Sequence, residues 1–305
     1  MKAVRIHSYG HSDQIRLEDV PRPNPGPGDV LVRVRAAGVN PVDWKIREGY
    51  LKDSLAISFP YTLGQDFSGE IEDVGPDVAG FKRGDAVFGF ASGAYAEYVT
   101  VRAGTMAQKP RTIDFDASAA IPTPCLTAYE LVVDVLRLTK DQVVLIHGAA
   151  GGVGAFAVQI ARWKQARVVA TVSAADAPEV RSLGAQEVID YKSERFEDRV
   201  KEVDAVIDLV GGQTLARSYG VVKPGGMVVS IVSPPDQRLL ADRKLRGRFF
   251  RMERDGLRLG KLADLIDRGT LQVRVKQLYP LLAAREAQDL SQTGQSHGKI
   301  VLRVG

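Results

Sequence analysis

Residues Val143–Gly154 read VVLIHGAAGGVG, an aliphatic block that runs directly into four glycines within seven positions. The aliphatic block predicts a buried strand, and the spacing of the apolar residues that follow predicts an amphipathic helix over Val153–Trp163. Three of the glycines, Gly148, Gly151 and Gly154, recur at every third residue of the junction. The most flexible backbone of this region is therefore placed between a strand and a helix.

This order of strand, glycine turn and helix predicts a site for a dinucleotide. A pyrophosphate needs a tight turn, a close approach of the backbone and close packing of helix on strand, and each of these excludes a side chain. The first turn of the helix also offers unpaired N–H groups and a partial positive charge to phosphates. The expected cofactor contacts are Gly148, Gly151, Gly152, Val153 and Gly154. A turn whose glycines only ease the packing of helix on strand is the alternative.

The chain of 305 residues is long enough for two domains. Its first part, to about residue 120, is rich in short apolar runs bounded by Gly, Pro and Asp, and residues 30–39 alternate as a half-buried strand does. From about residue 117, aliphatic strands alternate with helical stretches, which predicts a parallel sheet with crossover helices. Residues 298–305, GKIVLRVG, return to the pattern of a strand.

Composition excludes several classes of protein. No apolar run reaches the roughly 18–20 residues of a membrane span, and the N-terminus lacks the pattern of a signal peptide, so we expect a cytoplasmic protein without a membrane partner. The formal charge is only +4, and the basic segment 238–261 is interpreted as a solvated face rather than a nucleic-acid site. Cys125 is the single cysteine, which excludes an internal disulfide and a multi-cysteine zinc site.

The end of the next strand predicts which nicotinamide cofactor is bound. NAD-binding chains usually place an acidic residue about 20 residues after the glycines, where it binds the ribose. Here that strand ends at Val172 or Ser173, and Asp176 is expected in the first turn of the following helix. Ser173, Arg181 and Tyr191 could instead bind a 2′-phosphate, so NADPH is favoured over NADH. A capping Ser173, a solvated Arg181 and a packed Tyr191 are the alternatives.

Eight stretches that cover nearly the whole chain resemble one family of enzymes when taken together. They are AAGVNPVDWKIREG, GQDFSGEIEDVG, GDAVFGF, GAYAEYVTV, IPTPCLTAYELV, HGAAGGVGAFAVQIA, SLGAQEVIDY and HGKIVLRV. The sequence resembles the zinc-independent, quinone-oxidoreductase-like branch of the medium-chain dehydrogenase/reductase superfamily. The resemblance implies an α/β protein with a GroES-like β-barrel catalytic domain, residues 1–120 plus 269–305, and a doubly wound Rossmann domain, residues 121–268. It also implies a homodimer formed through the edge of the Rossmann sheet.

The residues at the family's zinc-ligand positions argue against a metal. Zinc-dependent members bind a catalytic zinc with Cys, His and Cys, and the resemblance aligns Asn40, Gln65 and Thr123 with these positions, with Asp66 beside Gln65. Catalytic zinc takes imidazole, thiolate or carboxylate ligands, which amides and a hydroxyl do not replace. The four histidines show no ligand spacing. We therefore expect no metal in this protein.

Without a metal, reduction of a conjugated C=C bond or a quinone is favoured over reduction of an isolated carbonyl. The negative charge that develops on oxygen then needs hydrogen-bond donors. Asn40 is the first candidate, and Lys45 and Tyr50 follow it in the same segment, where Asp43 could orient Lys45. A solvated Lys45 and a packed Tyr50 are the alternatives. A non-catalytic NADPH-binding sensor is the alternative function, since a fold does not fix an activity.

The resemblance assigns further contacts to the nicotinamide, to the ends of two later strands and to the C-terminal segment. The residues so assigned to the cofactor are Thr127, Val210, Gly211, Ile231, Val232, Ser233, Gly298 and Lys299. Phe249 and Phe250 are assigned to the wall of the substrate pocket.

Overall fold

The computed structural model describes residues 1–304, which form two compact units. The first unit contains Met1–Thr123 and the segment that begins at Arg254, and the second contains Pro124–Glu253. The sequence placed the return to the first domain later, at residue 269. The helix α9 (Gly256–Asp267) packs on β8 (Met106–Gln108) instead, where a Cβ on Gly256 would lie 2.4 Å from the Met106 carbonyl oxygen. Glycine permits this close approach, so residues 254–268 belong with the first unit.

The second unit is built on a parallel sheet of six strands within the described chain. The strands are β9 (Val143–His147), β10 (Arg167–Val172), β11 (Glu187–Asp190), β12 (Val203–Asp208), β13 (Val222–Ser230) and β14 (Arg246–Phe249). Their order is β11-β10-β9-β12-β13-β14, which is the doubly wound order with a switch between β9 and β12. Val, Ile and Leu are frequent in the inner strands β9, β10 and β12, because both faces of the sheet are buried there.

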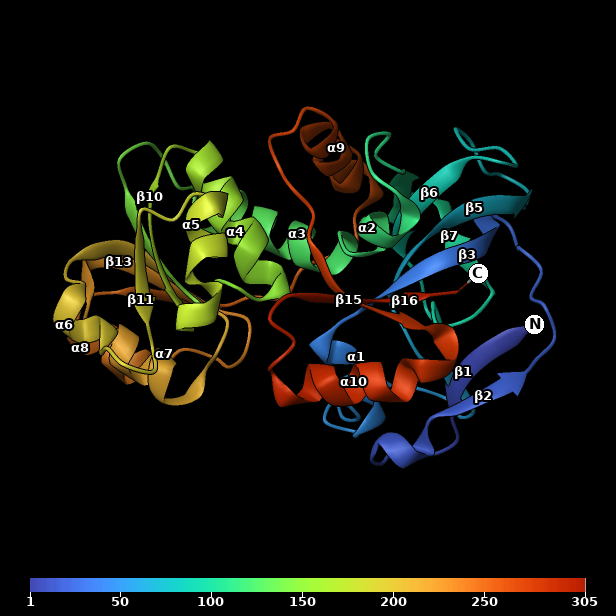
Figure 1. Cartoon of the computed structure of the whole chain (residues 1–305), viewed down its shortest axis with the longest axis horizontal. Coiled ribbons are helices and arrows are strands. Elements are labelled where there is room, and N and C mark those ends of the chain that lie inside the picture. Colours follow the sequence, from blue (N-terminus) through green and yellow to red (C-terminus); the bar gives the residue numbers. More distant parts are fainter. Residues whose placement is uncertain (305) are drawn as a thin grey trace. The chain divides into compact units, whose positions relative to one another are not determined.

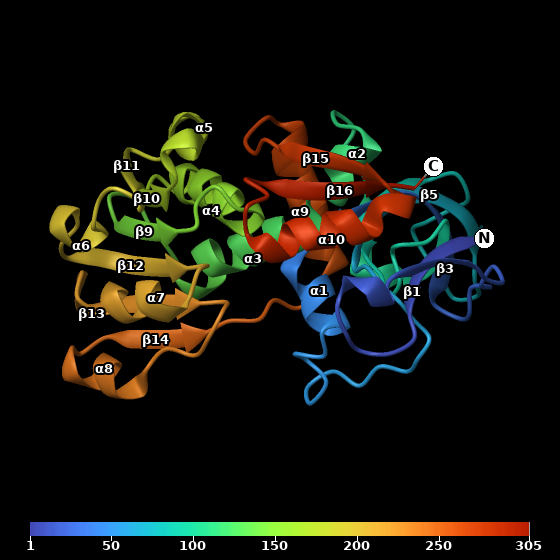
Figure 2. The same cartoon turned by 60° about the horizontal axis from the view of Figure 1, so that its bottom comes forward.

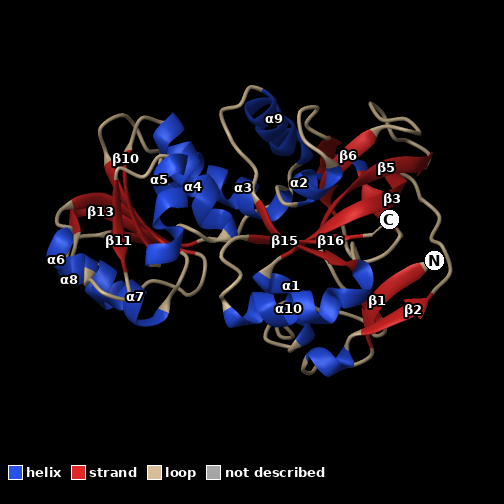
Figure 3. Cartoon of the chain, viewed as in Figure 1, coloured by secondary structure: helices blue, strands red, loops and turns tan. Residues whose placement is uncertain are grey.

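Helices cover both faces of this sheet, as Figure 3 shows. They are α4 (Gly152–Trp163), α5 (Ala177–Leu183), α6 (Phe196–Arg199), α7 (Gly212–Ser218) and α8 (Gln237–Asp242). The helix α3 (Pro122–Tyr129) and a π-helical turn over Glu130–Val135 precede β9. The predicted helix after the glycines is confirmed and begins one residue earlier, at Gly152.

The first unit is mainly antiparallel and joins both ends of the chain (Figure 1). Its larger sheet has the order β15-β16-β3-β5-β6-β8, with β7 also paired to β3, and its smaller sheet has the order β2-β1-β4. The strands of the larger sheet are β3 (Asp29–Val39), β5 (Asp66–Val74), β6 (Ala86–Phe90), β7 (Tyr98–Arg102), β8, β15 (Val275–Pro280) and β16 (Lys299–Arg303). The strands of the smaller sheet are β1 (Lys2–Ile6), β2 (Arg16–Asp19) and β4 (Tyr61–Thr62).

Three further helices belong to the first unit: α1 (Pro41–Arg47), α2 (Phe115–Ala119) and α10 (Ala284–Thr293). Figure 2 shows β15 and β16 side by side with α10 running along them. The strand β16 pairs antiparallel with β3, so that Val39 lies opposite Ile300, and β3 pairs with β5, so that Gly38 lies opposite Asp66. Segments far apart in the sequence therefore meet at the end of β3. Within residues 1–304, no helix has the length and apolar character of a membrane span.

Candidate functional site

A buried polar cluster lies where β3 ends and β5 and β16 begin. Asn40 follows β3, Asp66 opens β5, Lys299 opens β16, and Thr123 comes from the first turn of α3. Asn40, Asp66 and Lys299 are 4%, 0% and 6% exposed. Gly38 leaves room for these side chains, because a Cβ there would lie 3.2 Å from Lys299 Nζ and 2.3 Å from a main-chain oxygen.

Asp66 is the common acceptor of this cluster. Its Oδ2 accepts hydrogen bonds from Asn40 Nδ2 at 2.8 Å and from the Thr123 backbone N–H at 3.1 Å. Its Oδ1 accepts from the Thr123 hydroxyl at 2.5 Å. Asn40 and Thr123, two of the three residues aligned with zinc-ligand positions, therefore both donate hydrogen bonds to Asp66. The sequence had placed Asp66 only beside Gln65.

The side chain of Lys299 also belongs to this cluster. Its ammonium donates to the Val39 carbonyl at 2.9 Å and to Asn40 Oδ1 at 2.5 Å, and lies 3.7 Å from Asp66 Oδ2. Burial lowers the pKa of Lys299, while the charges of Asp66 and Asp43 oppose that shift. The sequence expectation was a contact between Lys299 and the cofactor. In the structure its ammonium contacts acceptors of the first unit, and the contact with the cofactor stays a prediction.

Asp43 holds the backbone of Asn40 in place. Its Oδ2 accepts hydrogen bonds from the Asn40 N–H at 2.8 Å and from the Tyr95 hydroxyl at 2.9 Å. Its Oδ1 is buried and has no hydrogen-bond partner among residues 1–304. Burial raises the pKa of Asp43 to about 7, although both hydrogen bonds act to lower it. Asp43 therefore orients the start of α1 and not Lys45.

Lys45 and Tyr50, the other two predicted donors, make their contacts elsewhere. Both side chains contact the Trp44 ring, Lys45 with its ammonium 5.6 Å from the ring centre and Tyr50 edge to face at 5.9 Å. Tyr50 remains 69% exposed. Asn40 is thus the one predicted donor that the described contacts place in the buried cluster.

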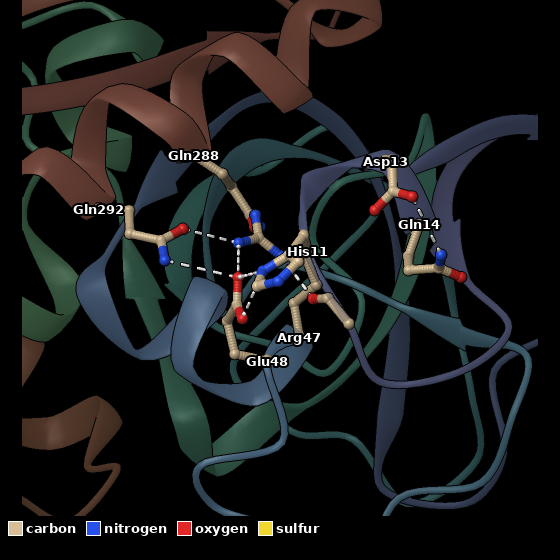
Figure 4. Close-up of polar contacts among 8 residues, drawn as sticks. His11, Asp13, Gln14, Arg47, Glu48, Gln288 and Gln292 are labelled. Carbon is tan, nitrogen blue, oxygen red and sulfur yellow. Dashed lines mark hydrogen bonds and ion pairs between the residues drawn. The ribbon is translucent and has the colours of Figure 1, made fainter.

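The short helix α1 is fixed from its C-terminal end by Arg47, which is fully buried (Figure 4). Its guanidinium donates to Gln288 Oε1 at 2.9 Å and Gln292 Oε1 at 2.8 Å on α10, and to Glu48 Oε1 at 2.6 Å. A buried guanidinium is stable only when its donors are satisfied. This network therefore ties α1, and with it Asn40, to the C-terminal helix.

The aligned zinc-ligand residues do not form a zinc site. The Gln65 side-chain oxygen accepts from Arg254 at 2.9 Å, while Asn40 and Thr123 bind Asp66. The Lys299 ammonium already donates a hydrogen bond to the side-chain oxygen of Asn40. Cys125 is buried, and burial raises the pKa of its thiol. Within residues 1–304, no three His, Cys, Asp or Glu side chains group as metal ligands would. These residues do not fit a catalytic zinc.

In the second unit, the predicted glycine turn forms a tight, closely packed junction between β9 and α4. Gly148 has φ +70°, a conformation that favours glycine, and a Cβ on Gly154 would lie 2.3 Å from the Gly148 carbonyl oxygen. Gly151 is the N-cap of α4 and supplies no side-chain cap. The first N–H groups of α4, from Gly152 and Val153 onward, are therefore suited to donate hydrogen bonds to an anion.

The end of β10 differs in one respect from the sequence expectation. The Ser173 hydroxyl donates to Asp176 Oδ2 at 2.6 Å, so a carboxylate lies next to the predicted 2′-phosphate position. Tyr191 is 60% exposed, and its N–H donates to the Val172 carbonyl at 3.1 Å, which sets it beside this strand end. Arg181 is exposed on α5, and the exposed Lys192 adds a cation that the sequence reading missed.

Asp208, a residue absent from the sequence prediction, orders the two loops that follow β12 and β13. It is fully buried, accepts from the backbone N–H groups of Val210 and Gly211 at 3.2 and 2.9 Å, and accepts from the Ser230 hydroxyl at 2.7 Å. Ser230 in turn accepts from the next loop, from the backbone N–H groups of Val232 and Ser233. An acidic residue at the end of an aliphatic strand was the signal for this role.

The remaining predicted residues are placed as follows. Thr127 is buried on α3, and the Ile231 N–H donates to the Asp208 carbonyl. Phe249 ends the edge strand β14, and the Phe250 N–H donates to the Ser230 carbonyl. Gly298 has φ +140°, and a Cβ there would lie 2.4 Å from Lys276 Cγ, so it serves the backbone of the first unit.

This arrangement, a doubly wound nucleotide-binding unit with a separate mainly antiparallel unit, defines a two-domain dehydrogenase. Residues 26–111 match the family described as alcohol dehydrogenase GroES-like domain, and residues 183–302 match the family described as zinc-binding dehydrogenase. The chain belongs to the medium-chain dehydrogenase/reductase superfamily, in its quinone-oxidoreductase-like group.

Named relatives support this assignment. The chain is 32% identical over 322 residues to a quinone oxidoreductase of Rattus norvegicus, covering 99% of this chain and 97% of the rat protein. It matches the structure of the quinone oxidoreductase of Coxiella burnetii with a TM-score of 0.92, 33% identity and coverage of 100% and 99%. The Escherichia coli quinone oxidoreductase, solved in complex with NADPH, matches with a TM-score of 0.92, 28% identity and full coverage of both chains.

Proposed function

We propose that this protein is an NADPH-dependent reductase of quinones or α,β-unsaturated carbonyl compounds that works without zinc. The observation that carries the proposal is the buried Asn40 amide, held by Asp66 and Lys299 at a position where zinc-dependent relatives place a metal ligand. The rat, Coxiella and E. coli proteins to which the chain is similar are quinone oxidoreductases, which supports the same class of reaction.

NADPH would supply a hydride when bound. The backbone N–H groups at the start of α4 would hold its pyrophosphate, since the glycines exclude side chains there. Tyr191 and Lys192 would hold the 2′-phosphate, and the Ser173 hydroxyl would join them by turning its proton away from Asp176, whose carboxylate opposes the phosphate. The loops after β12 and β13, which Asp208 orders through hydrogen bonds, would hold the nicotinamide half of NADPH together with Thr127.

On the substrate side, the chain's task is to stabilise charge that develops on oxygen. Addition of a hydride to the β-carbon of an enone, or to a quinone, leaves negative charge on the conjugated oxygen. Asn40 would donate an N–H of its side chain to that oxygen. A buried, preorganised donor is worth more than an exposed one, because little water competes for the charge. The proton that completes the reduction would come from solvent.

The edge strand β14 of the sheet in the second unit is a candidate surface for association of two copies. We propose that two copies associate through β14, the last strand of the sheet. Arg246 and Arg248 are exposed on this strand and, two residues apart, point to the same face. Each copy would bring the same pair of cations to the interface.

The proposed activity is tested by following NADPH oxidation against a panel of enones and quinones, with protein dialysed against chelator. Turnover that persists in the dialysed protein is the expected result. Activity that appears only after zinc is restored would refute the metal-free reaction. Tight NADPH binding without turnover on any acceptor would refute the enzyme and favour a sensor.

A further inference from the structure

The side-chain amide of Asn40 is oriented by two opposite charges. A carboxamide has an oxygen acceptor and two N–H donors. In the structure its Oδ1 accepts from the Lys299 ammonium at 2.5 Å, and its Nδ2 donates to Asp66 Oδ2 at 2.8 Å. An ammonium can only donate and a carboxylate can only accept, so these partners determine which end of the amide is nitrogen.

Both partners are themselves fixed by contacts that do not involve Asn40. Lys299 is held by the Val39 carbonyl at 2.9 Å, and Asp66 is held by the backbone and hydroxyl of Thr123. Asp66 is the first residue of β5 and Lys299 is the first residue of β16, and these two strands flank β3. Both side chains are buried. Buried charges keep their positions because moving either one away from its partners leaves it uncompensated.

One N–H of Asn40 remains after these bonds are counted. If the amide turned over, its oxygen would take the place of this N–H, and an acceptor would then face the developing oxyanion. The contact of Lys299 with Oδ1 also withdraws electrons from the amide, which strengthens the remaining donor.

We infer that Asp66 and Lys299 are positioning residues for Asn40, and that together they leave a single amide N–H as the donor to the substrate oxygen. This inference rests on the proposed function and assigns no substrate contact to either charged residue. The buried pair, Asp66 and Lys299, then sets the direction and the strength of the remaining Asn40 N–H donor.

The first test variant is Lys299→Met, which removes the donor to Oδ1 and lets the amide turn over. It also leaves Asp66 as an uncompensated buried charge, so the fold could fail. The companion Lys299→Met/Asp66→Asn removes both charges and keeps a side-chain oxygen that can accept from Asn40 and Thr123. Lys52→Met, at an exposed lysine of the same unit, is the matched control.

The measurement is a double-mutant cycle on kcat, combined with the KM of an enone and the Kd of NADPH. Misplacing a catalytic group commonly lowers the rate by as much as about 10²-fold. We expect kcat to fall at least tenfold in Lys299→Met and in the companion, with KM and the NADPH Kd nearly unchanged. In an Asn40→Ala background, Lys299→Met should change kcat by less than about twofold, since its target is absent.

Two results overturn the inference while the proposed function stands. One is a folded companion with the kcat of the unmodified protein. The other is a loss from Lys299→Met that is equally large with and without Asn40, which would show that Lys299 acts independently. The proposed function fails by a different result, the absence of turnover in the unmodified protein.

Discussion

Tyr95 donates a hydrogen bond to Oδ2 of Asp43 across 2.9 Å, and both side chains are buried, 0% and 1% exposed. The same oxygen accepts the Asn40 N–H, whereas Oδ1 of Asp43 has no partner among residues 1–304. A protonated carboxyl fits this arrangement, because its proton would occupy the oxygen without a partner. This relationship links the titration of Asp43 to the stability of the first unit.

The first prediction concerns stability and pH. Burial raises the pKa of Asp43 from 3.8 in an unfolded chain to about 7 in the fold. Its contribution to stability is therefore complete below about pH 4 and is lost as pH rises through 7, on the order of 4 kcal/mol in all. Asp43→Asn mimics the protonated form and should escape this loss. In urea unfolding, the free energy of unfolding of the variant should rise relative to that of the unmodified protein between pH 5 and 7.5.

Asp53→Asn, at an exposed aspartate, is the control and should show no such pH-dependent gain. A stability difference between Asp43→Asn and the unmodified protein that stays constant from pH 5 to 8 would contradict the assignment.

A second prediction separates two glycines of the same turn. Gly151 is extended, with φ −72° and ψ 173°, and a Cβ there would lie 3.3 Å from the Gly148 oxygen, so Gly151→Val should fold. Its side chain should still block the pyrophosphate and weaken NADPH binding at least tenfold, or about 1.4 kcal/mol. Fluorescence titration measures this. Gly154→Ala should instead lower the thermal midpoint, because its Cβ would lie 2.3 Å from the Gly148 oxygen.

If Gly151→Val folds and binds NADPH as tightly as the unmodified protein, the glycines of the turn serve packing alone. That outcome would favour a turn whose glycines only ease the packing of α4 on β9.

The third prediction concerns cofactor choice. The Asp176 carboxylate beside Ser173 should repel a 2′-phosphate and reduce the preference for NADPH over NADH. Asp176→Asn should raise the ratio of the NADH Kd to the NADPH Kd about fivefold, the effect of about 1 kcal/mol of charge repulsion. Lys192→Ala should lower the same ratio. A ratio unaffected by both changes would place the 2′-phosphate elsewhere.

A fourth prediction follows from the proposed pairing at β14. Because Arg246 and Arg248 of each copy would approach their counterparts, like charges oppose association at low ionic strength. Sedimentation should show a larger dimer fraction in 500 mM than in 50 mM salt. A dimer that dissociates as salt is added would contradict this edge as the interface.

The sequence predicted the nucleotide-binding unit well because its signals are local. A strand, a glycine turn and an amphipathic helix lie within about 25 residues, and the structure confirms each of them. The later boundary was misplaced because α9 packs on β8, a contact that depends on Gly256 and leaves no periodic signal.

The buried polar cluster around Asn40 could be predicted only in part. Asn40 was identified from its position, but Asp66 and Lys299 reach it through the pairing of β3 with β5 and β16, between residues more than 25 and 250 positions away. The proximity of Lys45 and Tyr50 in sequence suggested a shared role. The structure shows instead that Lys45, on α1, and Tyr50, in the turn after it, both contact the Trp44 ring.

The most direct test follows deuterium from stereospecifically labelled NADPH into an enone, using protein dialysed against chelator and its Asn40→Ala variant. The proposal predicts deuterium at the β-carbon of the product, with kcat lowered about 10²–10³-fold by Asn40→Ala and NADPH binding unchanged. Quinones, which are better hydride acceptors, should lose less. Undiminished transfer in the variant would contradict the role of Asn40, and the absence of label in every product would contradict the reductase itself.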